Sequence, residues 1–491
     1  MNFVRDVLES YPASKPALLA IDAQGERRVW HFGELIAMSA GVSGALAARG
    51  VGRGDVVMTL VGNRIEWVLT LLAAWRMGAV ALPMSNQLRE KDLELRELVS
   101  NPKVCVGETE LLEALPGGVE TVDLSEFTEI LDEDRPQETP AGIADLDPSD
   151  PALIVFTSGT TGEPRGALHT AGYLMAQRTQ AEHWLGAREG DLVWCTTATG
   201  WSKSARNVFV APWLCGAAAL ISDARFDAEA RLALVESEGV NVLCQAPTEY
   251  RMLAKRTDLR KIRGLRRMVS AGEPLNPEVM RIFREAMGQD IHDGYGQTET
   301  GHITGNLVGQ PVRDGSMGTP LPGLDIRIEG TAGEPGELQV RAESCPTFFD
   351  RYLDESRDDA MARLVDGEWW PTGDVVSQDA DGYLFYEGRN DDLILSAGYR
   401  IGPFEVESAL VSHPAVAEAA AVAMRDEERG AVVRAVVVLR DGKPSDQLAD
   451  ELRDHVKAMT APYKAPRVIE FADELPKTTS GKIRRADLRS A

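Results

Sequence analysis

Short apolar runs alternate with longer segments of helical spacing over the first 150 residues. Apolar runs at 17–21, 29–32 and 55–62 predict strands. Residues 33–49 and 63–79 place apolar side chains at helical spacing and predict two helices. Strands that alternate with helices predict a largely parallel sheet covered by helices on both faces.

A second group of elements follows residues 137–151, which are rich in proline and aspartate and predict a linker or long loop. A bare apolar run at 152–156 predicts a strand, and strand–helix units continue to about residue 310. The glycine- and proline-rich residues 310–337 predict a change to short antiparallel strands.

The C-terminal part of the chain has a different pattern. In order, it predicts hairpin strands at 382–385 and 392–395, a helix at 403–412, a strand at 432–439 and an amphipathic helix at 445–459. This mixture predicts a small α+β module that follows a short polar segment, RNDD. We therefore divide the chain into a large N-terminal domain at 1–388 and a small C-terminal domain at 389–491.

Composition and charge exclude several classes of protein. The 491 residues are 44% apolar, an ordinary globular composition that excludes disordered, collagen-like and coiled-coil chains. A net charge of −24 argues against a nucleic-acid partner, because phosphate binding needs a basic face. The longest nearly uncharged apolar run, 208–221, is shorter than the roughly 20 residues of a spanning helix. We expect no membrane span and, since the first residues hold no apolar signal segment, a cytoplasmic location.

Cysteine and histidine give little support for a metal centre. The seven histidines include no H-E-x-x-H motif. The cysteines are odd in number and widely spaced, so we interpret them as buried thiols: Cys105, Cys195, Cys215, Cys244 and Cys345. Residues 251–267 carry eight lysines or arginines against one aspartate, which fits either a solvated helix face or a local site for a polyanionic small molecule.

A loop suited to phosphates comes directly after the predicted strand 152–156. Residues 157–166 (TSGTTGEPRG) hold three glycines, four hydroxyl residues and one arginine. Glycines let backbone N–H groups point inward, hydroxyls add donors and the arginine adds charge, which are the ingredients of an anion-binding nest. The loop is not a Walker A motif, because the required G-x-x-x-x-G-K-[ST] spacing is absent.

Five further polar segments follow in order along the chain: 270–274 (SAGEP), 293–301 (DGYGQTETG), 372–374 (TGD), 388–392 (GRNDD) and 476–482 (PKTTSGK). Together with the loop they resemble the motifs of the adenylate-forming superfamily of acyl-CoA synthetases, luciferases and peptide synthetase adenylation domains. The phrases 199–201 (TGW), 397–403 (AGYRIGP) and 460–464 (TAPYK) are most similar to medium-chain acyl-CoA synthetases.

The resemblance implies a fold and a reaction. The implied fold class is α/β, with a large N-terminal domain of stacked mixed α/β sheets plus a β-barrel-like subdomain, and a small mobile α+β C-terminal domain. The implied reaction has two steps: a carboxylic acid reacts with ATP to give acyl-AMP and pyrophosphate, and CoA then displaces AMP. ATP, Mg²⁺ and CoA are the implied cofactors, and the oligomeric state, monomer or homodimer, stays open.

Residue roles follow from the matched motifs. Lys482 is the implied catalytic cation between the carboxylate and the α-phosphate, where an anion must approach a polyanion. Thr298 is the implied contact of the α-phosphate, and Glu299 the implied ligand of Mg²⁺. The implied ATP-binding residues are Thr157, Ser158, Gly159, Thr160, Thr161, Gly162, Glu163, Pro164, Arg165, Gly272, Glu273, Pro274, Asp293, Gly294, Tyr295, Gly296, Gln297, Thr298, Asp374, Arg389 and Lys482. Among them, Asp374 and Arg389 match ribose-binding positions, and Arg165 replaces the lysine that is usual in the loop.

The second step needs a different face of the small domain. Asp391 matches the hinge position about which the small domain rotates in the family. The implied CoA-contacting residues are Gln87, Ala397, Gly398, Tyr399, Arg400 and Arg429. Ala397 stands where relatives often carry serine.

The acyl pocket is implied to be lined by Trp201, Lys203, Ala271 and Gly296. Acetate-specific relatives carry tryptophan at the position of Gly296, so glycine implies room for a medium-chain, branched or aromatic acid. Lys203 either projects into this pocket or points to solvent. An aryl-CoA (benzoate-type) ligase is the closest alternative. An amino-acid adenylation enzyme and a non-catalytic nucleotide-binding homologue are more distant ones.

Overall fold

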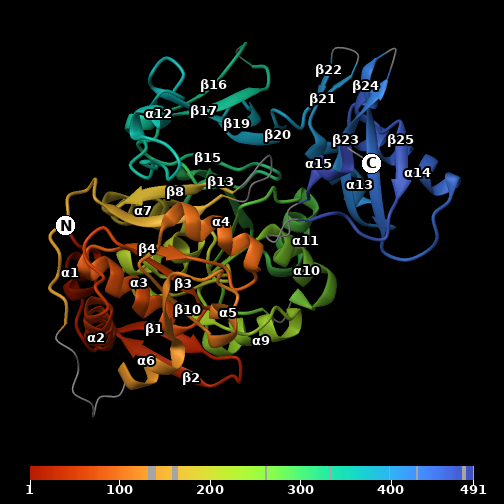
Figure 1. The fold of residues 1–491 in the computed structure, drawn as a ribbon. Helices are drawn as coiled ribbons and strands as arrows, with labels where there is room; N and C mark the ends of the chain where they lie inside the picture. Colours follow the sequence, from red (N-terminus) through yellow and green to blue (C-terminus); the bar gives the residue numbers. More distant parts are fainter. Residues whose placement is uncertain are drawn as a thin grey trace.

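The computed structural model describes residues 1–130, 140–157, 164–259, 262–331, 333–396, 399–426, 429–477 and 483–489. Its strands form two large sheets, a smaller antiparallel sheet, and two sheets near the C-terminus. Figure 1 shows the C-terminal elements, coloured blue, gathered to one side of the rest of the chain. Among the helices of the described ranges, none is both long and apolar enough to cross a bilayer.

The first large sheet is parallel at its centre and antiparallel at its edges. Its spatial order is β15 (Thr319–Pro320), β14 (Gly301–Gly305), β13 (Ile291–Gln297), β12 (Arg267–Ala271), β11 (Val242–Gln245), β9 (Leu192–Cys195), β10 (Ala218–Ser222), β1 (Pro16–Ile21) and β2 (Arg27–His31). The carboxyl ends of the parallel strands meet at one edge, which is where open α/β sheets bind ligands.

The second large sheet is also mostly parallel, with antiparallel strands at one edge. Its spatial order is β18 (Arg351–Tyr352), β8 (Gly166–Thr170), β7 (Pro151–Phe156), β4 (Val80–Pro83), β3 (Val56–Leu60), β5 (Val104–Gly107) and β6 (Glu120–Asp123). The strands from β7 to β6 are parallel, and β8 and β18 add an antiparallel edge. The predicted α/β architecture is therefore confirmed.

Helices cover the faces of both sheets. In the large part of the chain they are α1 (Phe3–Asp6), α2 (Phe32–Ala48), α3 (Ile65–Met77), α4 (Glu90–Ser100), α5 (Thr109–Leu112), α6 (Leu124–Ile130), α7 (Ala171–Gln180), α8 (Ala211–Leu214), α9 (Ala228–Glu238), α10 (Pro247–Arg256), α11 (Pro277–Met287) and α12 (Arg357–Met361). Two π-helical turns, η2 (Ala181–Leu185) and η3 (Arg206–Val210), precede or follow them, and short 3₁₀ turns lie at η1 (Leu8–Ser10) and η5 (Ala342–Ser344).

One apolar core joins the two large sheets. It contains side chains from strands of both sheets together with α2, α3, α7 and α8. Aromatic rings of α3 and of the η3–α8 segment meet in it. The ring centroids of Trp67 and Phe209 are 5.3 Å apart, and those of Phe209 and Trp213 are 4.8 Å apart. Burial of such large rings dominates core energetics. The two sheets are therefore fixed against each other through these helices.

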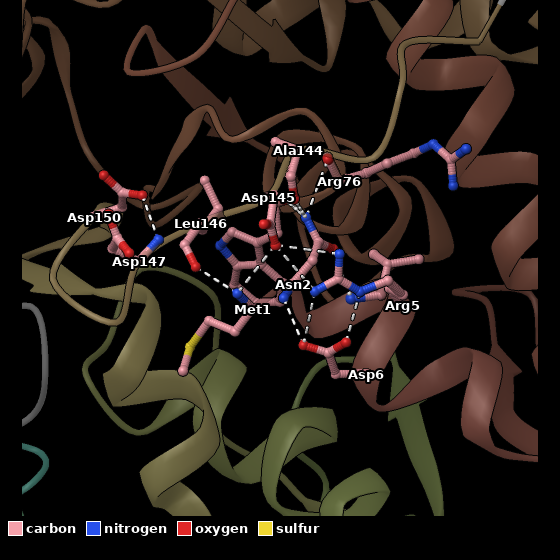
Figure 2. A network of polar contacts seen from close by, with 12 residues as sticks. Met1, Asn2, Arg5, Asp6, Arg76, Ala144, Asp145, Leu146, Asp147 and Asp150 are labelled. Atoms are coloured by element: carbon pink, nitrogen blue, oxygen red, sulfur yellow. Dashed lines mark hydrogen bonds and ion pairs between the residues drawn. The ribbon is translucent and has the colours of Figure 1, made fainter.

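The N-terminus is tied to the segment that connects the two groups of elements. The Asn2 amide donates to the carbonyl oxygens of Trp75 at 2.9 Å and Ala144 at 3.0 Å (Figure 2). The Met1 amino group donates to the Leu146 carbonyl, and Arg5 lies 3.3 Å from Asp145. Residues 140–150 hold no helix or strand, so the predicted linker is confirmed for its described part.

The remaining strands form smaller sheets. The third sheet is antiparallel, with β16 (Ile326–Ile328), β17 (Gly336–Arg341), β19 (Trp369–Gln378) and β20 (Leu384–Arg389) in that order. The C-terminal part holds β21 (Ile394–Ser396), β22 (Tyr399–Ile401), β23 (Val416–Asp426), β24 (Gly430–Leu439) and β25 (Val468–Phe471), with α13 (Pro403–Ser412), α14 (Asp446–Met459), η6 (Pro462–Lys464) and α15 (Arg485–Arg489). It has an apolar core of its own.

Two local predictions need correction. The strands predicted at 382–385 and 392–395 do not pair with each other, because β20 pairs with β19 and β21 pairs with β22. The basic stretch 251–267 is not one helix face: it contains the end of α10 and the start of β12. Arg267 is buried there and donates to the carbonyl oxygens of Trp184 and Asn306.

Candidate active site

A cleft of about 2670 Å³ opens where the carboxyl ends of the parallel strands in the first sheet meet the third sheet and the C-terminal part. Thr196, Ser222 and Ala271 line it at the ends of β9, β10 and β12. Lys477 and Arg485 line it from the C-terminal side. Its place at the strand ends is the usual position of a ligand site in open α/β sheets.

Most of the predicted site residues that the structure describes line this one cleft. They are Gln87, Thr157, Pro164, Arg165, Trp201, Lys203, Ala271, Gly272, Glu273, Pro274, Asp293, Gly294, Tyr295, Gly296, Gln297, Thr298, Glu299, Asp374, Arg389 and Asp391. These residues come from segments between positions 87 and 391, which the fold brings to the same edge.

The remaining predicted residues fall into two groups. Ser158, Gly159, Thr160, Thr161, Gly162, Glu163, Ala397, Gly398 and Lys482 fall outside the described residues, as does the side chain of Arg400. Tyr399 and Arg429 are exposed and are not among the residues that line the cleft. The predicted CoA-contacting residues whose side chains the structure describes are therefore divided between the cleft, at Gln87, and the exposed surface of the C-terminal part, at Tyr399 and Arg429.

Asp374 is the centre of a buried polar network. Its carboxylate accepts hydrogen bonds from the Tyr295 hydroxyl and, at 2.8 Å, from the Gln297 amide. The Gln297 amide also donates to the Thr372 carbonyl at 2.7 Å. Burial and the nearby Asp374 carboxylate raise the pKa of Tyr295 well above its ordinary value, so this phenol keeps its proton and stays a donor.

Arg389 lies beside this network because β19 and β20 are paired with Asp374 opposite Arg389. Its guanidinium is 3.6 Å from the Asp374 carboxylate and donates to the Thr372 carbonyl at 3.2 Å. It is also 3.5 Å from Asp391, which follows the end of β20. The sheet register thus places one carboxylate and one cation side by side on the wall of the cleft.

Glu299 belongs to a second network of the cleft. Its carboxylate accepts a hydrogen bond from the Tyr352 hydroxyl, and the Tyr352 ring lies 3.9 Å from the Arg165 guanidinium. Arg165 is ion-paired with Asp354 at 2.7 Å and with Glu355 at 3.0 Å. The charge expected to serve the phosphate loop is therefore already partnered by two acids.

The backbone closes the base of the phosphate loop. Thr157 N–H donates to the Arg165 carbonyl at 2.9 Å, and Arg165 N–H donates to the Thr157 hydroxyl at 3.1 Å. These two bonds tie together the described residues on both sides of the loop. The loop starts at the end of β7 and returns into β8.

The turn that holds the predicted ATP-binding residues Gly272, Glu273 and Pro274 is fixed by its neighbours. Gly272 has a φ of +107°, a conformation that glycine adopts without strain. The Glu273 carboxylate accepts from the Thr248 hydroxyl at 2.8 Å, and Arg251 donates to the same hydroxyl at 2.7 Å. Burial raises the pKa of Asp293 in β13 well above its ordinary value, which favours the protonated carboxyl.

Lys203 points inward, which decides between the two orientations that the sequence leaves open. Its ammonium donates to the Ala271 carbonyl, and a β-carbon placed on Gly272 would lie 3.1 Å from its Nζ. Gly296 has a separate structural reason to be glycine, because a β-carbon there would lie 1.9 Å from the Gly301 carbonyl oxygen. The predicted role of Gly296 in acyl length stays a prediction.

The C-terminal part reaches the cleft through segments on both sides of residue 482. Lys477 and Ile483 line the cleft and are bridged to each other as antiparallel partners. Arg485 follows and pairs with Glu407 at 2.7 Å and with Asp392 at 3.5 Å. These contacts hold the end of the chain against the segment after β20.

Three residues of the cleft were not predicted from the sequence. Tyr352 lies far from the motifs that it supports, although it bonds Glu299. Arg206 and His302 line the same cleft as the predicted acyl wall. His302 directly follows the motif 293–301, and Arg206 lies three positions after Lys203, so their proximity to matched residues was the available signal.

Comparison with known proteins agrees with this geometry. The model of the AMP-binding enzyme family matches residues 4–349, and the model of the AMP-binding enzyme C-terminal domain matches residues 405–482. The chain therefore belongs to the family of AMP-binding enzymes.

Individual relatives match over nearly the full length. The uncharacterized acyl-CoA ligase YtcI of Bacillus subtilis (strain 168) is 40% identical, with 99% of this chain and 95% of the relative covered. The mitochondrial acyl-coenzyme A synthetase ACSM3 of Mus musculus is 38% identical, with 99% and 90% covered. A crystal structure of the anthranilate CoA ligase AuaEII in complex with anthranoyl-AMP has a TM-score of 0.88 at 30% identity, with 100% and 97% covered.

These matches confirm three predictions: the adenylate-forming superfamily, the α/β fold with a large N-terminal and a small C-terminal domain, and an AMP-forming acid–thiol ligase of the acyl-CoA synthetase type. The boundary between residues 388 and 389 stays a prediction. It falls at the end of β20, just before the segment that leads into a different sheet.

Proposed function

We propose that the protein activates a medium-chain, branched or aromatic carboxylic acid with ATP and Mg²⁺, and then transfers the acyl group from acyl-AMP to CoA. The observation that carries the proposal is that one cleft contains both the predicted ribose residues, Asp374 and Arg389, and the predicted acyl wall, Trp201 and Lys203. A nucleotide and a second substrate can therefore meet in one cavity.

The ribose is bound by the network around Asp374. A buried carboxylate accepts hydrogen bonds from vicinal hydroxyls more strongly than a neutral group does. Tyr295 and Gln297 already donate to Asp374, so its orientation is set before the nucleotide arrives. Such pre-orientation lowers the entropy that binding must remove.

Lys482 neutralises charge as the carboxylate approaches the α-phosphate. Two anions repel each other, and a cation placed between them stabilises the charge that builds up in transit. Support comes from Lys477 and Ile483, which flank its segment and line the cleft. The phosphate loop 157–165 binds the β- and γ-phosphates, and Thr298 contacts the α-phosphate.

Glu299 provides the carboxylate for Mg²⁺. The ion prefers carboxylate and phosphate oxygens and keeps several waters. Glu299 fits this requirement, since one of its oxygens is oriented by the Tyr352 hydroxyl at the wall of the cleft. When bound, Mg²⁺ would neutralise phosphate charge.

The thioester step uses rotation of the C-terminal domain about Asp391. Residues 390–393 connect β20 of the third sheet to β21 of the C-terminal part. Tyr399 and Arg429 lie on its outer surface here, so a rotation is required to bring them to the cleft. Domain closure of this kind commonly completes a site between two half-reactions.

The test separates the half-reactions. Purified protein is assayed for acid-dependent ATP–pyrophosphate exchange and for thioester formation with CoA, using octanoate and benzoate. We expect both activities, and Lys482→Gln is expected to slow exchange at least about 100-fold. Lys443→Gln is the matched control, because Lys443 also follows a glycine but is exposed in the loop after β24. Exchange at the normal rate in Lys482→Gln contradicts the proposed role of Lys482.

The same panel addresses the alternative substrate class. Preference for benzoate over octanoate identifies an aryl-CoA ligase, and the reverse identifies a medium-chain enzyme. Benzoate is included in the panel because the structure is similar to that of an anthranilate CoA ligase. The cytoplasmic location stays a prediction.

A further inference from the structure

An arginine that lines the cleft has no hydrogen-bond or ion-pair partner among the residues that the structure describes. Arg206 is 4% exposed, lines the cleft, and begins the π-helical turn η3. Its Nε and Nη1 atoms are buried and have no hydrogen-bond partner among the described residues. A guanidinium stays charged in proteins, and a buried unpaired charge is strongly unfavourable.

The surroundings of Arg206 are cationic or neutral. Lys203 lies three positions earlier and points into the same cleft, donating to the Ala271 carbonyl. His302 is 2% exposed, both of its ring nitrogens lack a partner among the described residues, and its ring lies 3.8 Å from that of Trp184. Burial, with Arg206 and Lys203 adding to it, lowers the pKa of His302 well below its ordinary value, so the imidazole is neutral.

Three acids that line the cleft do not pair with Arg206. Glu249 pairs with Arg231 at 3.2 Å, and Glu299 accepts from Tyr352. Asp293 is buried with a raised pKa, which disfavours its charged form. No ion pair connects Arg206 to an acid within the described ranges.

Two glycines pack closely against the cluster, whose members Arg206, Lys203 and His302 all line the cleft. A β-carbon on Gly294 would lie 2.5 Å from the His302 Nε2, and one on Gly301 would lie 3.5 Å from the Arg206 Nη1. Both glycines belong to the strand pair β13–β14, next to the predicted adenylate site. The cluster therefore shares one cleft with Thr298 and Glu299, the residues proposed to serve the step in which the carboxylate is activated.

We propose that the acyl substrate carries a second carboxylate, which Arg206 binds with the help of Lys203 and His302. This inference rests on the proposed function and names its substrate class: a dicarboxylic acid activated at one end. Only the first carboxylate attacks ATP; the second stays ionised and unreacted. A monocarboxylic acid of the same length leaves Arg206 buried and unpaired, and sites built to bond a polar group reject analogues that lack it.

The experiment compares matched pairs of acids that differ only in the second carboxylate: butyrate and succinate, hexanoate and adipate, octanoate and suberate, benzoate and isophthalate. The neutral half-ester monomethyl adipate separates charge from hydrogen-bond acceptance. kcat/KM is measured by CoA thioester formation. We expect the dicarboxylate to exceed its monocarboxylate in at least one pair, and adipate to exceed its half-ester if the adipate pair is the preferred one.

Variants connect the preference to Arg206. Arg206→Met is expected to lower the ratio of dicarboxylate to monocarboxylate kcat/KM at least about 30-fold, because one partner of a buried charge pair is lost. Arg206→Lys keeps the charge and retains part of the ratio. Arg178→Gln, an exposed arginine of α7 paired with Glu182, is the control. Thermal melting checks that each variant folds. If Arg206→Met does not fold, the ratio is measured in Arg206→Lys instead.

The outcomes separate the two proposals. If monocarboxylates exceed dicarboxylates in every pair, or if the ratio in a folded Arg206→Met stays within threefold of the unmodified protein, the inference about Arg206 is wrong while the acyl-CoA synthetase activity stands. If no acid of either kind supports pyrophosphate exchange or thioester formation, the proposed function itself fails.

Discussion

Asp374→Asn tests the nucleotide site most directly, because it removes one charge with almost no change in volume. Asp374 is 5% exposed, and its carboxylate accepts from Tyr295 and Gln297 and lies 3.6 Å from Arg389. The same carboxylate is proposed to accept from the two ribose hydroxyls of ATP. The substitution leaves the strand pairing of β19 and β20 in place, since only the side chain changes.

The expected magnitude follows from the bonds that are lost. A hydrogen bond to a charged group contributes about 1.5–3 kcal/mol, against about 0.5–1.5 kcal/mol for a neutral pair. Two ribose hydroxyls therefore lose about 2–3 kcal/mol together, which corresponds to a rise of about 30- to 150-fold in the Kd of ATP. The effect falls on ATP and AMP alike, because both carry the same ribose.

The assay is direct titration of ATP and of AMP into the purified protein, with pyrophosphate exchange as a second readout. Asp381→Asn is the matched control: Asp381 is an exposed acid in the turn between β19 and β20, and it pairs with Arg313. Thermal melting reports whether the buried network still folds. A properly folded Asp374→Asn that binds ATP within threefold of the unmodified protein refutes the ribose assignment.

Three further predictions address the metal, the hinge and the domain contact. Glu299→Gln is expected to raise the Mg²⁺ concentration for half-maximal exchange at least about tenfold, because a carboxylate ligand is replaced by a neutral amide; an unchanged Mg²⁺ titration speaks against the assignment. Asp391→Pro is expected to leave pyrophosphate exchange nearly intact and to slow thioester formation, because proline stiffens the hinge; equal loss of both half-reactions contradicts it. Lys255, which donates to the Ala417 carbonyl of the C-terminal part, has its pKa lowered to about 8 by burial and nearby arginines. The unfolded chain binds its proton more tightly, so its contribution to stability rises as pH increases from about 8 to about 10.5, and melting of Lys255→Met should lack that rise.

Local patterns of apolar and polar residues were sufficient to predict individual helices and strands. The strand predicted at 17–21 is β1, and the helix predicted at 403–412 is α13 with the same bounds. The amphipathic helix predicted at 445–459 is α14, which Ser445 caps by accepting from the Leu448 N–H. Such patterns work because helix and strand periods are set by neighbouring residues.

Contacts between residues far apart in the sequence could not be predicted from those local patterns. The two strands predicted on either side of residue 389 were expected as hairpin strands, yet β20 joins β19 of the third sheet and β21 joins β22. The basic stretch 251–267 does not form one helix face, because Arg267 at its end is buried and donates to the carbonyl of Trp184 in η2. Partner choice between strands depends on packing of the whole sheet, which no short window of sequence contains.

The sequence by itself determined the order of the polar motifs, the helices and strands between them, and through these the family of AMP-binding enzymes. Only the tertiary structure decided that Lys203 points inward and that Arg165 forms ion pairs with Asp354 and Glu355. It alone also showed that Arg206 has no partner among the described residues. The reason is physical: a motif needs only local backbone geometry, whereas the charge state and direction of a side chain depend on every element packed around it.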